Sequence, residues 1–267
     1  MLKQRLLTVA IIMPLLLAAM FLLPGVWWQF VVVAPLLVAG HEWSKLAGFS
    51  RTGEAIFLSL LAVGVGFIWV AALRGGANRE FGAFFAHSVY FFSVAFWLII
   101  APCWLWLKLT LRNRFALGLV GIVVLLPLWL ALAQLQINPL LLLFLFAVVW
   151  LADTGAYFFG KTFGRHKLAP GVSPGKTWEG VGGAFAAVTV YALILFWGRF
   201  IGHDFQFLIA AFLGMTVFSV LGDLFESWLK RGASVKDSGT ILPGHGGLLD
   251  RIDSVMAALP LAALIFI

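Results

Sequence analysis

The sequence predicts an all-α, polytopic membrane protein with about nine transmembrane helices and a cytoplasmic N-terminus. Of the 267 residues, 63% are hydrophobic and 11% are charged, whereas a soluble domain carries about a quarter charged residues. Apolar runs of about 17–25 residues, the length that crosses a bilayer, recur along the whole chain. We therefore attribute the net charge of +7 to membrane topology and an anionic substrate, and expect no nucleic-acid partner.

Nine apolar segments are expected to be the spans. The first is interpreted as a retained helix rather than a cleaved signal peptide, because it is long for a signal sequence and another apolar run follows at once. Turn formers separate several segments, as at Asn138-Pro139. The segments are residues 6–23, 27–40, 55–73, 84–107, 115–134, 139–158, 180–198, 206–229 and 254–267.

Positive charge sets the expected orientation. With the N-terminus in the cytoplasm, 15 of the 18 Lys and Arg residues fall on the cytoplasmic side, and only Arg74, Arg79 and Arg199 fall on the other. Seven of the eleven acids lie after residue 150 and on or near the cytoplasmic side. Residues 1–150 are thus interpreted as transmembrane scaffold. Residues 151–267 are interpreted as the catalytic region, with cytoplasmic loops at 159–179 and 230–253.

Acidic residues near the end of the eighth span form the first candidate site. Asp223, Glu226 and Ser227 share one helix face, and a carboxylate at this depth is costly unless it is paired or solvated. One interpretation is a ligand for a hard cation such as Mg²⁺. The other is an acid paired with Lys230, Arg231 or another loop cation.

Two further acids begin the last span. Asp250 and Asp253, with Arg251 between them, share a face if the helix starts near Leu248, and could then meet Asp223. Asp223 and Asp250 are the expected ligands of one or two divalent ions, with Glu226 and Asp253 as further candidates. The alternative is a pair of acids favoured by the helix dipole.

A glycine-rich turn precedes these acids. Gly246 and Gly247 would let backbone N–H groups approach a phosphate, next to the cations Lys230, Arg231, Lys236 and Arg251. His245 either contacts phosphate, takes part in proton transfer or braces the loop.

The other cytoplasmic loop carries hydroxyls, a cation and an acid at Ser173, Lys176, Thr177 and Glu179. It lacks the leading glycines of a P-loop, but a helix N-terminus of this kind can hold phosphate. The alternative is a solvated loop on the membrane surface. Asp153 either contacts substrate or pairs with a loop cation, and Glu42 is interpreted as a local pair with Lys45.

The pattern S-x-L-K-R-x4-K-D-x-G-x2-L-P-x-H-G-G-x-x-D-R-x-D runs without a gap from Ser227 to Asp253. It resembles the signature of the phosphatidate cytidylyltransferases, also called CDP-diacylglycerol synthases. Asp153 to Tyr157 and Ser173 to Glu179 are also similar to that family. The resemblance covers about the last 115 residues.

The resemblance implies an Mg²⁺-dependent reaction of CTP with phosphatidic acid that gives CDP-diacylglycerol and pyrophosphate, in membrane lipid and at the bacterial cytoplasmic (inner) membrane. The implied catalytic residues are Asp223, Lys230, Arg231, Lys236, Asp250, Arg251 and Asp253. The implied substrate-binding residues are Asp153, Ser173, Lys176, Thr177, Glu179, Ser227, His245, Gly246 and Gly247. A homodimer is one of the oligomeric states left open.

Two other classes of membrane protein explain the sequence less completely. A CDP-alcohol phosphotransferase would carry the pattern D-G-x2-A-R-x8-G-x3-D-x3-D, which this sequence lacks. An ion-coupled transporter would explain Asp153 and Asp223 as buried acids, but not the clustered cations and glycines.

The charge count predicts that loops 159–179 and 230–253 share the cytoplasmic side. After Cys103 is replaced, a single cysteine placed in either loop should resist an impermeant thiol reagent in intact cells and react after the membrane is opened. Labelling of either loop from outside would overturn the orientation.

Overall fold

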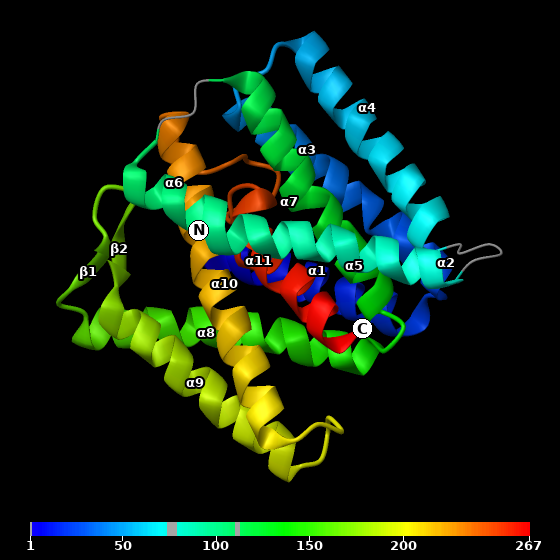
Figure 1. Cartoon of the computed structure of the whole chain (residues 1–267). Coiled ribbons are helices and arrows are strands. Elements are labelled where there is room, and N and C mark those ends of the chain that lie inside the picture. The colour runs from blue at the N-terminus through cyan, green and yellow to red at the C-terminus, as the bar shows by residue number, and fades with distance from the viewer. Residues whose placement is uncertain (1, 74–78, 110–112) are drawn as a thin grey trace.

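The computed structural model describes residues 2–73, 79–109 and 113–267, most of which are helical (Figure 1). Arg74, counted above, lies outside this range. The long helices and their shorter companions are α1 Leu2–Leu22, α2 Gly25–Val31, α3 Val33–Leu46, α4 Arg51–Ile68, α5 Arg79–Ala95, α6 Ala101–Leu107, α7 Arg114–Leu135, α8 Pro139–Phe163, α9 Trp178–Trp197, α10 Phe205–Gly232 and α11 Leu249–Phe266.

Local sequence explains several helix starts. The side chain of Asn138 accepts a hydrogen bond from Leu141 N–H at the start of α8, where Pro139 occupies the first helical position. Asp204 caps α10 in the same way through Phe207 N–H. These caps satisfy backbone donors that the first helical turn leaves without partners.

Six helices in the described part of the chain are long and apolar enough to cross a membrane, so the chain is an integral membrane protein. Short π-helical segments extend two of them: Trp69–Leu73 continues α4, and Phe96–Ile100 joins α5 to α6. The six are Arg51–Leu73, Glu80–Leu107, Arg114–Leu135, Pro139–Phe163, Trp178–Trp197 and Phe205–Gly232.

The other three expected spans differ from these six, and their status as spans stays a prediction. In α1, the apolar stretch Leu7–Leu22 is shorter than the others. The segment 27–40 is divided at Val32 between α2 and α3. The last helix, α11, is apolar only after its charged first turns, and it is enclosed by protein.

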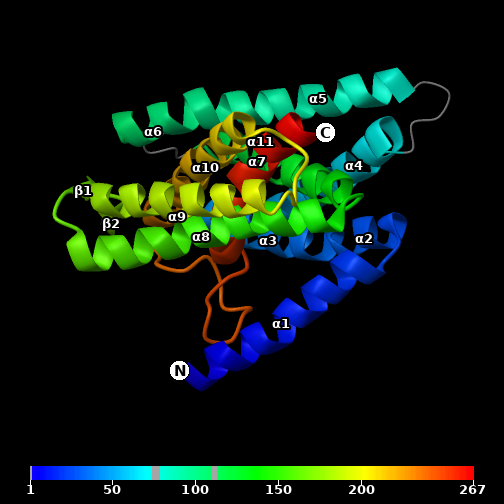
Figure 2. The same ribbon diagram turned by 90° about the horizontal axis from the view of Figure 1, so that it is seen from below.

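Helix α11 lies at the centre of the fold, in contact with α3, α5, α7, α8 and α10. Met256, Ala257, Ala258 and Leu259 on this helix are fully buried. Figure 2 shows α5 and α6 crossing one face of the molecule, while α1 lies obliquely on the opposite side. Alanine along α11 suits this position, because small side chains let neighbouring helices approach closely.

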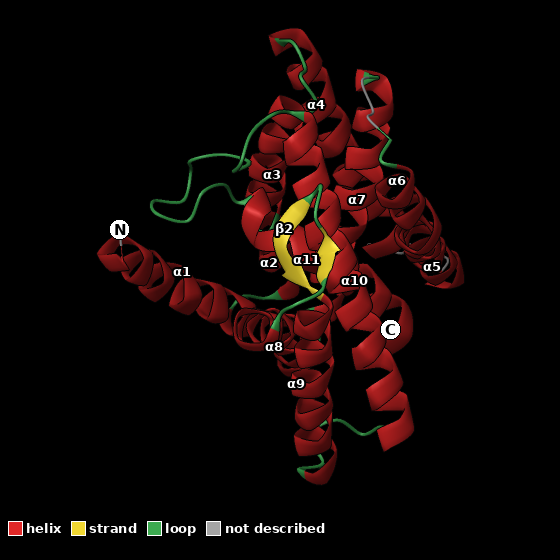
Figure 3. Cartoon of the chain, turned by 90° about the vertical axis from the view of Figure 1, so that its left-hand side faces the viewer, coloured by secondary structure: helices red, strands yellow, loops and turns green. Residues whose placement is uncertain are grey.

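The described chain departs from an all-α fold by a β-hairpin within the expected loop 159–179. Helix α8 continues to Phe163, and the strands β1 (Lys167–Ala169) and β2 (Ser173–Thr177) then form an antiparallel hairpin (Figure 3). Strand β2 leads directly into α9. The hairpin therefore fixes Ser173 and Lys176 relative to a helix, as a free loop would not.

Helices α8 and α9 meet through glycine. A Cβ added to Gly155 would lie 2.6 Å from the carbonyl oxygen of Gly183, and one added to Gly183 would lie 2.3 Å from Cβ of Phe159. Neither position has room for a side chain, so the two backbones are in direct contact. This contact sets the place of the hairpin that joins the two helices.

The Gly183→Ala variant should therefore be destabilised by about 1–3 kcal/mol, the usual cost of overpacking. Gly182→Ala is the matched control, because a Cβ at Gly182 meets nothing within 4 Å and alanine favours a helix by up to about 1 kcal/mol over glycine. Thermal midpoints of the two purified variants in detergent give the comparison. Equal midpoints would contradict the close contact.

Candidate active site

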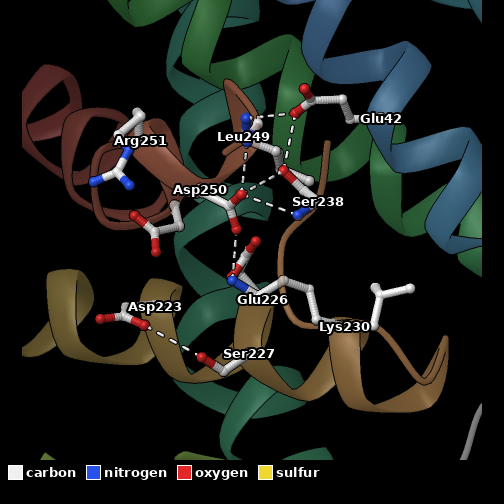
Figure 4. Close-up of polar contacts among 12 residues, drawn as sticks. Glu42, Asp223, Glu226, Ser227, Lys230, Ser238, Leu249, Asp250 and Arg251 are labelled. Atoms are coloured by element: carbon white, nitrogen blue, oxygen red, sulfur yellow. Dashed lines mark hydrogen bonds and ion pairs between the residues drawn. The ribbon is translucent and has the colours of Figure 1, made fainter. Parts of the chain in front are cut away.

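Lys230 near the end of α10 meets Asp250 in the first turn of α11, with Glu226 beside it (Figure 4). The two helices touch at Gly222, where an added Cβ would lie 2.3 Å from the carbonyl oxygen of Asp253. Helix α11 begins at Leu249, close to the start at Leu248 on which the sequence interpretation depended. This contact places the acids of both helices near one another.

Lys230 forms the centre of the first cluster, which we call the Lys230 cluster and which consists of Glu226, Lys230 and Asp250. Its Nζ lies 2.5 Å from Oε2 of Glu226 and 2.6 Å from Oδ1 of Asp250. The three side chains are 12%, 0% and 8% exposed for Lys230, Glu226 and Asp250, respectively. Since buried charges need partners, the single cation holds both carboxylates in place and links α10 to α11.

The second oxygen of Asp250 is surrounded by the signature loop. Its Oδ2 accepts hydrogen bonds from Ser238 N–H at 2.9 Å, Ser238 Oγ at 3.1 Å and Gly247 N–H at 2.9 Å. Burial acts to raise the pKa of Asp250, but the bond to Lys230 and these loop donors prevail and lower the pKa to about 2. Asp250 is therefore a carboxylate at neutral pH.

The glycine-rich turn is built around this carboxylate. Gly246 has φ of +83°, and a Cβ there would lie 2.9 Å from Oδ2 of Asp250, so the position requires glycine. The N–H of Gly247, expected to approach a phosphate, is donated to Asp250.

A second cluster, the Lys176 cluster, consists of Asp153, Lys176, Asp223 and Asp253. Lys176 Nζ on β2 lies 2.5 Å from Oδ2 of Asp223 on α10. Asp153 and Asp253 both interact electrostatically with Asp223 and Lys176. Residues from α8, β2, α10 and α11 thus meet here, and the loop that contains Lys176 reaches the signature although about 50 residues separate them in sequence.

Two serines hold Asp153 in this cluster. Its Oδ1 accepts bonds from Ser219 Oγ at 3.3 Å and Ser254 Oγ at 3.4 Å. The side chain remains exposed, so it can reach a bound molecule. Ser219 and Ser254 were not identified from the sequence, since isolated serines in apolar helices carry no distinguishing pattern.

The remaining hairpin residues brace the backbone. Thr177 caps α9 by accepting a bond from Gly180 N–H at 3.1 Å. Glu179 accepts bonds from the N–H groups of Arg165 and His166, and the His166 Nδ1 lies 2.6 Å from it. Ser173 begins β2. These contacts shape the turn that presents Lys176.

Several of the signature cations and polar groups contact the loop itself. Arg231 donates to the carbonyl oxygens of Val172 and Val235, each at 3.3 Å, and so ties the end of α10 to the hairpin. Arg251 donates to the carbonyl oxygen of His245 at 2.6 Å. Lys236 is exposed on the loop. Ser227 donates a hydrogen bond to Asp223 at 3.4 Å. The Nδ1 atom of His245 is buried and has no hydrogen-bond partner among the described residues.

The two acids of α11 therefore have different partners: Asp250 belongs to the Lys230 cluster and Asp253 to the Lys176 cluster. Asp223 and Glu226 are divided in the same way. In the described part of the chain, no three acidic, histidine or cysteine side chains are placed to hold a metal ion by themselves. The carboxylate donors nevertheless fit Mg²⁺, which usually takes one or two carboxylates and completes its shell with substrate phosphates and water.

The sequence interpretation missed Glu42 on α3. This side chain is buried, and it accepts hydrogen bonds from Ser238 Oγ, Leu248 N–H and Leu249 N–H rather than forming the expected local pair with Lys45. The available signal was its position, since Glu42 is the first acid of the chain and lies in an apolar segment. An acid in such a place needs partners.

These features define a class: a helical integral membrane protein with two linked acid–cation clusters at the ends of its helices. A sequence model of the cytidylyltransferase family matches residues 3–267. The chain belongs to this family.

Relatives with a common name support the assignment. The chain is 37% identical over 273 residues to a phosphatidate cytidylyltransferase of Pseudomonas aeruginosa, covering 98% of this chain and 96% of that protein. It is 34% identical over 287 residues to one of Haemophilus influenzae, covering 97% and 96%. A phosphatidate cytidylyltransferase of Staphylococcus aureus is 50% identical over 127 residues, covering 47% of this chain and 48% of that protein.

Lys230→Met should destabilise the protein by about 3 kcal/mol, because it leaves the carboxylates of Glu226 and Asp250 buried without their cation. The double variant Lys230→Met/Glu226→Gln removes one of those two carboxyl groups and should recover part of the loss. Thermal midpoints in detergent measure both. A wild-type midpoint for Lys230→Met would mean that the cluster does not hold α10 to α11.

Proposed function

We propose that this chain transfers the cytidylyl group of CTP to phosphatidic acid, forming CDP-diacylglycerol and pyrophosphate in phospholipid biosynthesis. The observation that supports this proposal most strongly is the similarity, over nearly the full length of the chain, to proteins named phosphatidate cytidylyltransferase. The site faces the cytoplasm from the bacterial cytoplasmic membrane, which agrees with the positive charge on that side of the sequence.

The chemistry needs positioning and charge compensation. A phosphate oxygen of phosphatidate attacks the α-phosphorus of CTP, the new P–O bond completes a diphosphate, and pyrophosphate leaves. Phosphatidate is ionised at neutral pH, so the attack requires no strong general base. Catalysis of phosphoryl-type transfer depends chiefly on orientation and on the stabilisation of negative charge.

The cations of both clusters serve this purpose. Lys176 lies at the end of β2, directly before the N-terminus of α9, where the helix dipole adds positive potential. Arg231 and Arg251 each have further guanidinium N–H groups, in addition to those that donate to loop carbonyls, and these can bind phosphate. Lys236, exposed on the loop, and Lys230 complete the set of cations that bind the substrate phosphates.

Mg²⁺ would be held by Asp223 together with Asp250 or Asp253. When bound, it would neutralise phosphate charge and fix the phosphates in place. Asp253 already interacts with Asp223, whereas Asp250 would exchange its bond to Lys230 for the ion. Ser227 donates a hydrogen bond to Asp223, and the negative charge of Asp153 nearby would add to the attraction for a cation.

Turnover of labelled CTP tests the function. Purified protein with phosphatidate and Mg²⁺ should convert radiolabelled CTP into CDP-diacylglycerol and equimolar pyrophosphate, and Asp250→Asn should nearly abolish this while leaving the protein folded. Wild-type protein that consumes no CTP with phosphatidate, under conditions where the Pseudomonas aeruginosa relative does, would refute the proposal.

Lys176→Ala should lower kcat/KM by the equivalent of about 2–4 kcal/mol of transition-state stabilisation, as for loss of a preorganised charge contact. It removes the cation paired with Asp223. Lys167→Ala, on the other strand of the hairpin and exposed, is the control and should cost much less. If both variants lower kcat/KM equally and mildly, the hairpin is only a cationic patch on the membrane surface.

A further inference from the structure

Glu42 on α3 binds the loop between α10 and α11 at two places, at Ser238 within the loop and at the junction of the loop with α11. Its Oε1 accepts Leu248 N–H at 3.0 Å, and its Oε2 accepts Leu249 N–H at 2.8 Å and Ser238 Oγ at 3.0 Å. The side chain comes from the scaffold half, about 200 residues earlier in the sequence, and is 1% exposed. A carboxylate with three donors in this setting fixes the loop and the start of α11 together.

The loop is shaped to admit this carboxylate. A Cβ on Gly239 would lie 2.4 Å from Oε1 of Glu42, and one on Gly247 would lie 2.6 Å from Oε2. Two of the signature glycines thus lie directly against Glu42. Their lack of side chains lets the loop close over it, and the positive end of the α11 dipole compensates its charge.

Ser238 connects Glu42 to the candidate active site. Its hydroxyl lies 3.0 Å from Oε2 of Glu42 and 3.1 Å from Oδ2 of Asp250, while Asp250 is bonded in turn to Lys230 (Figure 4). One continuous chain of contacts therefore runs from α3 through the loop to α11 and α10. Because Ser238 has a single hydroxyl proton, that proton is shared between the two carboxylates.

We infer that Glu42 is a positioning residue for the reaction proposed above. It acts through Ser238 and the first turn of α11, and so sets where Asp250, Arg251 and Asp253 lie relative to α10. Glu42 does not touch substrate in this role. Supporting contacts of this kind decide how well reactive groups are aligned, and small misplacements lower rates strongly.

Glu42→Gln tests the inference, since glutamine keeps the shape but turns an NH₂ group toward backbone or hydroxyl donors. We expect kcat/KM for CTP to fall about 10-fold or more, the effect of leaving a buried donor unsatisfied. Glu54→Gln is the matched control: Glu54 on α4 pairs with His41, the neighbour of Glu42 on α3, and this variant should keep kcat/KM within about twofold.

A second measurement separates positioning from general stability. Amide hydrogen exchange should rise in Glu42→Gln at residues 238–249, while the rest of α3, α7 and α10 stays as in wild type, since only the loop loses its anchor. In a double-mutant cycle, Glu42→Gln and Ser238→Ala should be non-additive in kcat/KM, because both break one chain of contacts.

Three outcomes would overturn the inference: wild-type kcat/KM in Glu42→Gln, exchange that rises uniformly through the protein, or additive effects in the cycle. If Glu42→Gln does not fold, Ser238→Ala alone decides, with faster exchange at 248–249 and a lower kcat/KM expected. Hydrogen exchange can be measured without turnover. An inactive wild-type protein would therefore refute the proposed reaction, and the exchange data would still show whether Glu42 anchors the loop.

Discussion

The arrangement depends on one ammonium group placed between two buried carboxylates. Lys230 joins Glu226 on its own helix to Asp250 on the next. Without the cation, two buried carboxyl groups would face each other in an interior with little water, and the first turn of α11 would have no electrostatic reason to lie against α10. The loop, the glycine turn and the Lys176 cluster are all placed relative to this junction.

Much of the outline could be predicted from the sequence because membrane helices follow from simple rules of length and polarity. Six of the nine expected spans correspond to long apolar helices, whereas α11 begins at Leu249, five residues before the expected span. The hairpin could not be predicted, because Ser173-Pro174-Gly175 has the composition of a turn, and strands this short take their pairing from tertiary contacts.

The sequence identifies many of the residues of the candidate site, but it does not predict how they are arranged in space. Spacing indicates that Asp250 and Asp253 lie near one another on α11, but it does not say that one faces Lys230 and the other Lys176. That division depends on where α10 and β2 lie in space. Glu42 was misinterpreted for a related reason: Lys45 was near in sequence, whereas the true partners, Ser238, Leu248 and Leu249, lie about 200 residues away.

The central place of α11 has a consequence for biosynthesis. Ribosomes make the chain from the N-terminus, so α3, α5, α7, α8 and α10 all leave the translation machinery before the helix that fills the space between them. Until α11 arrives, those helices have no common centre and Lys230 lacks one of its two acids. The site can therefore form only after α11 has been made, as a late event of assembly.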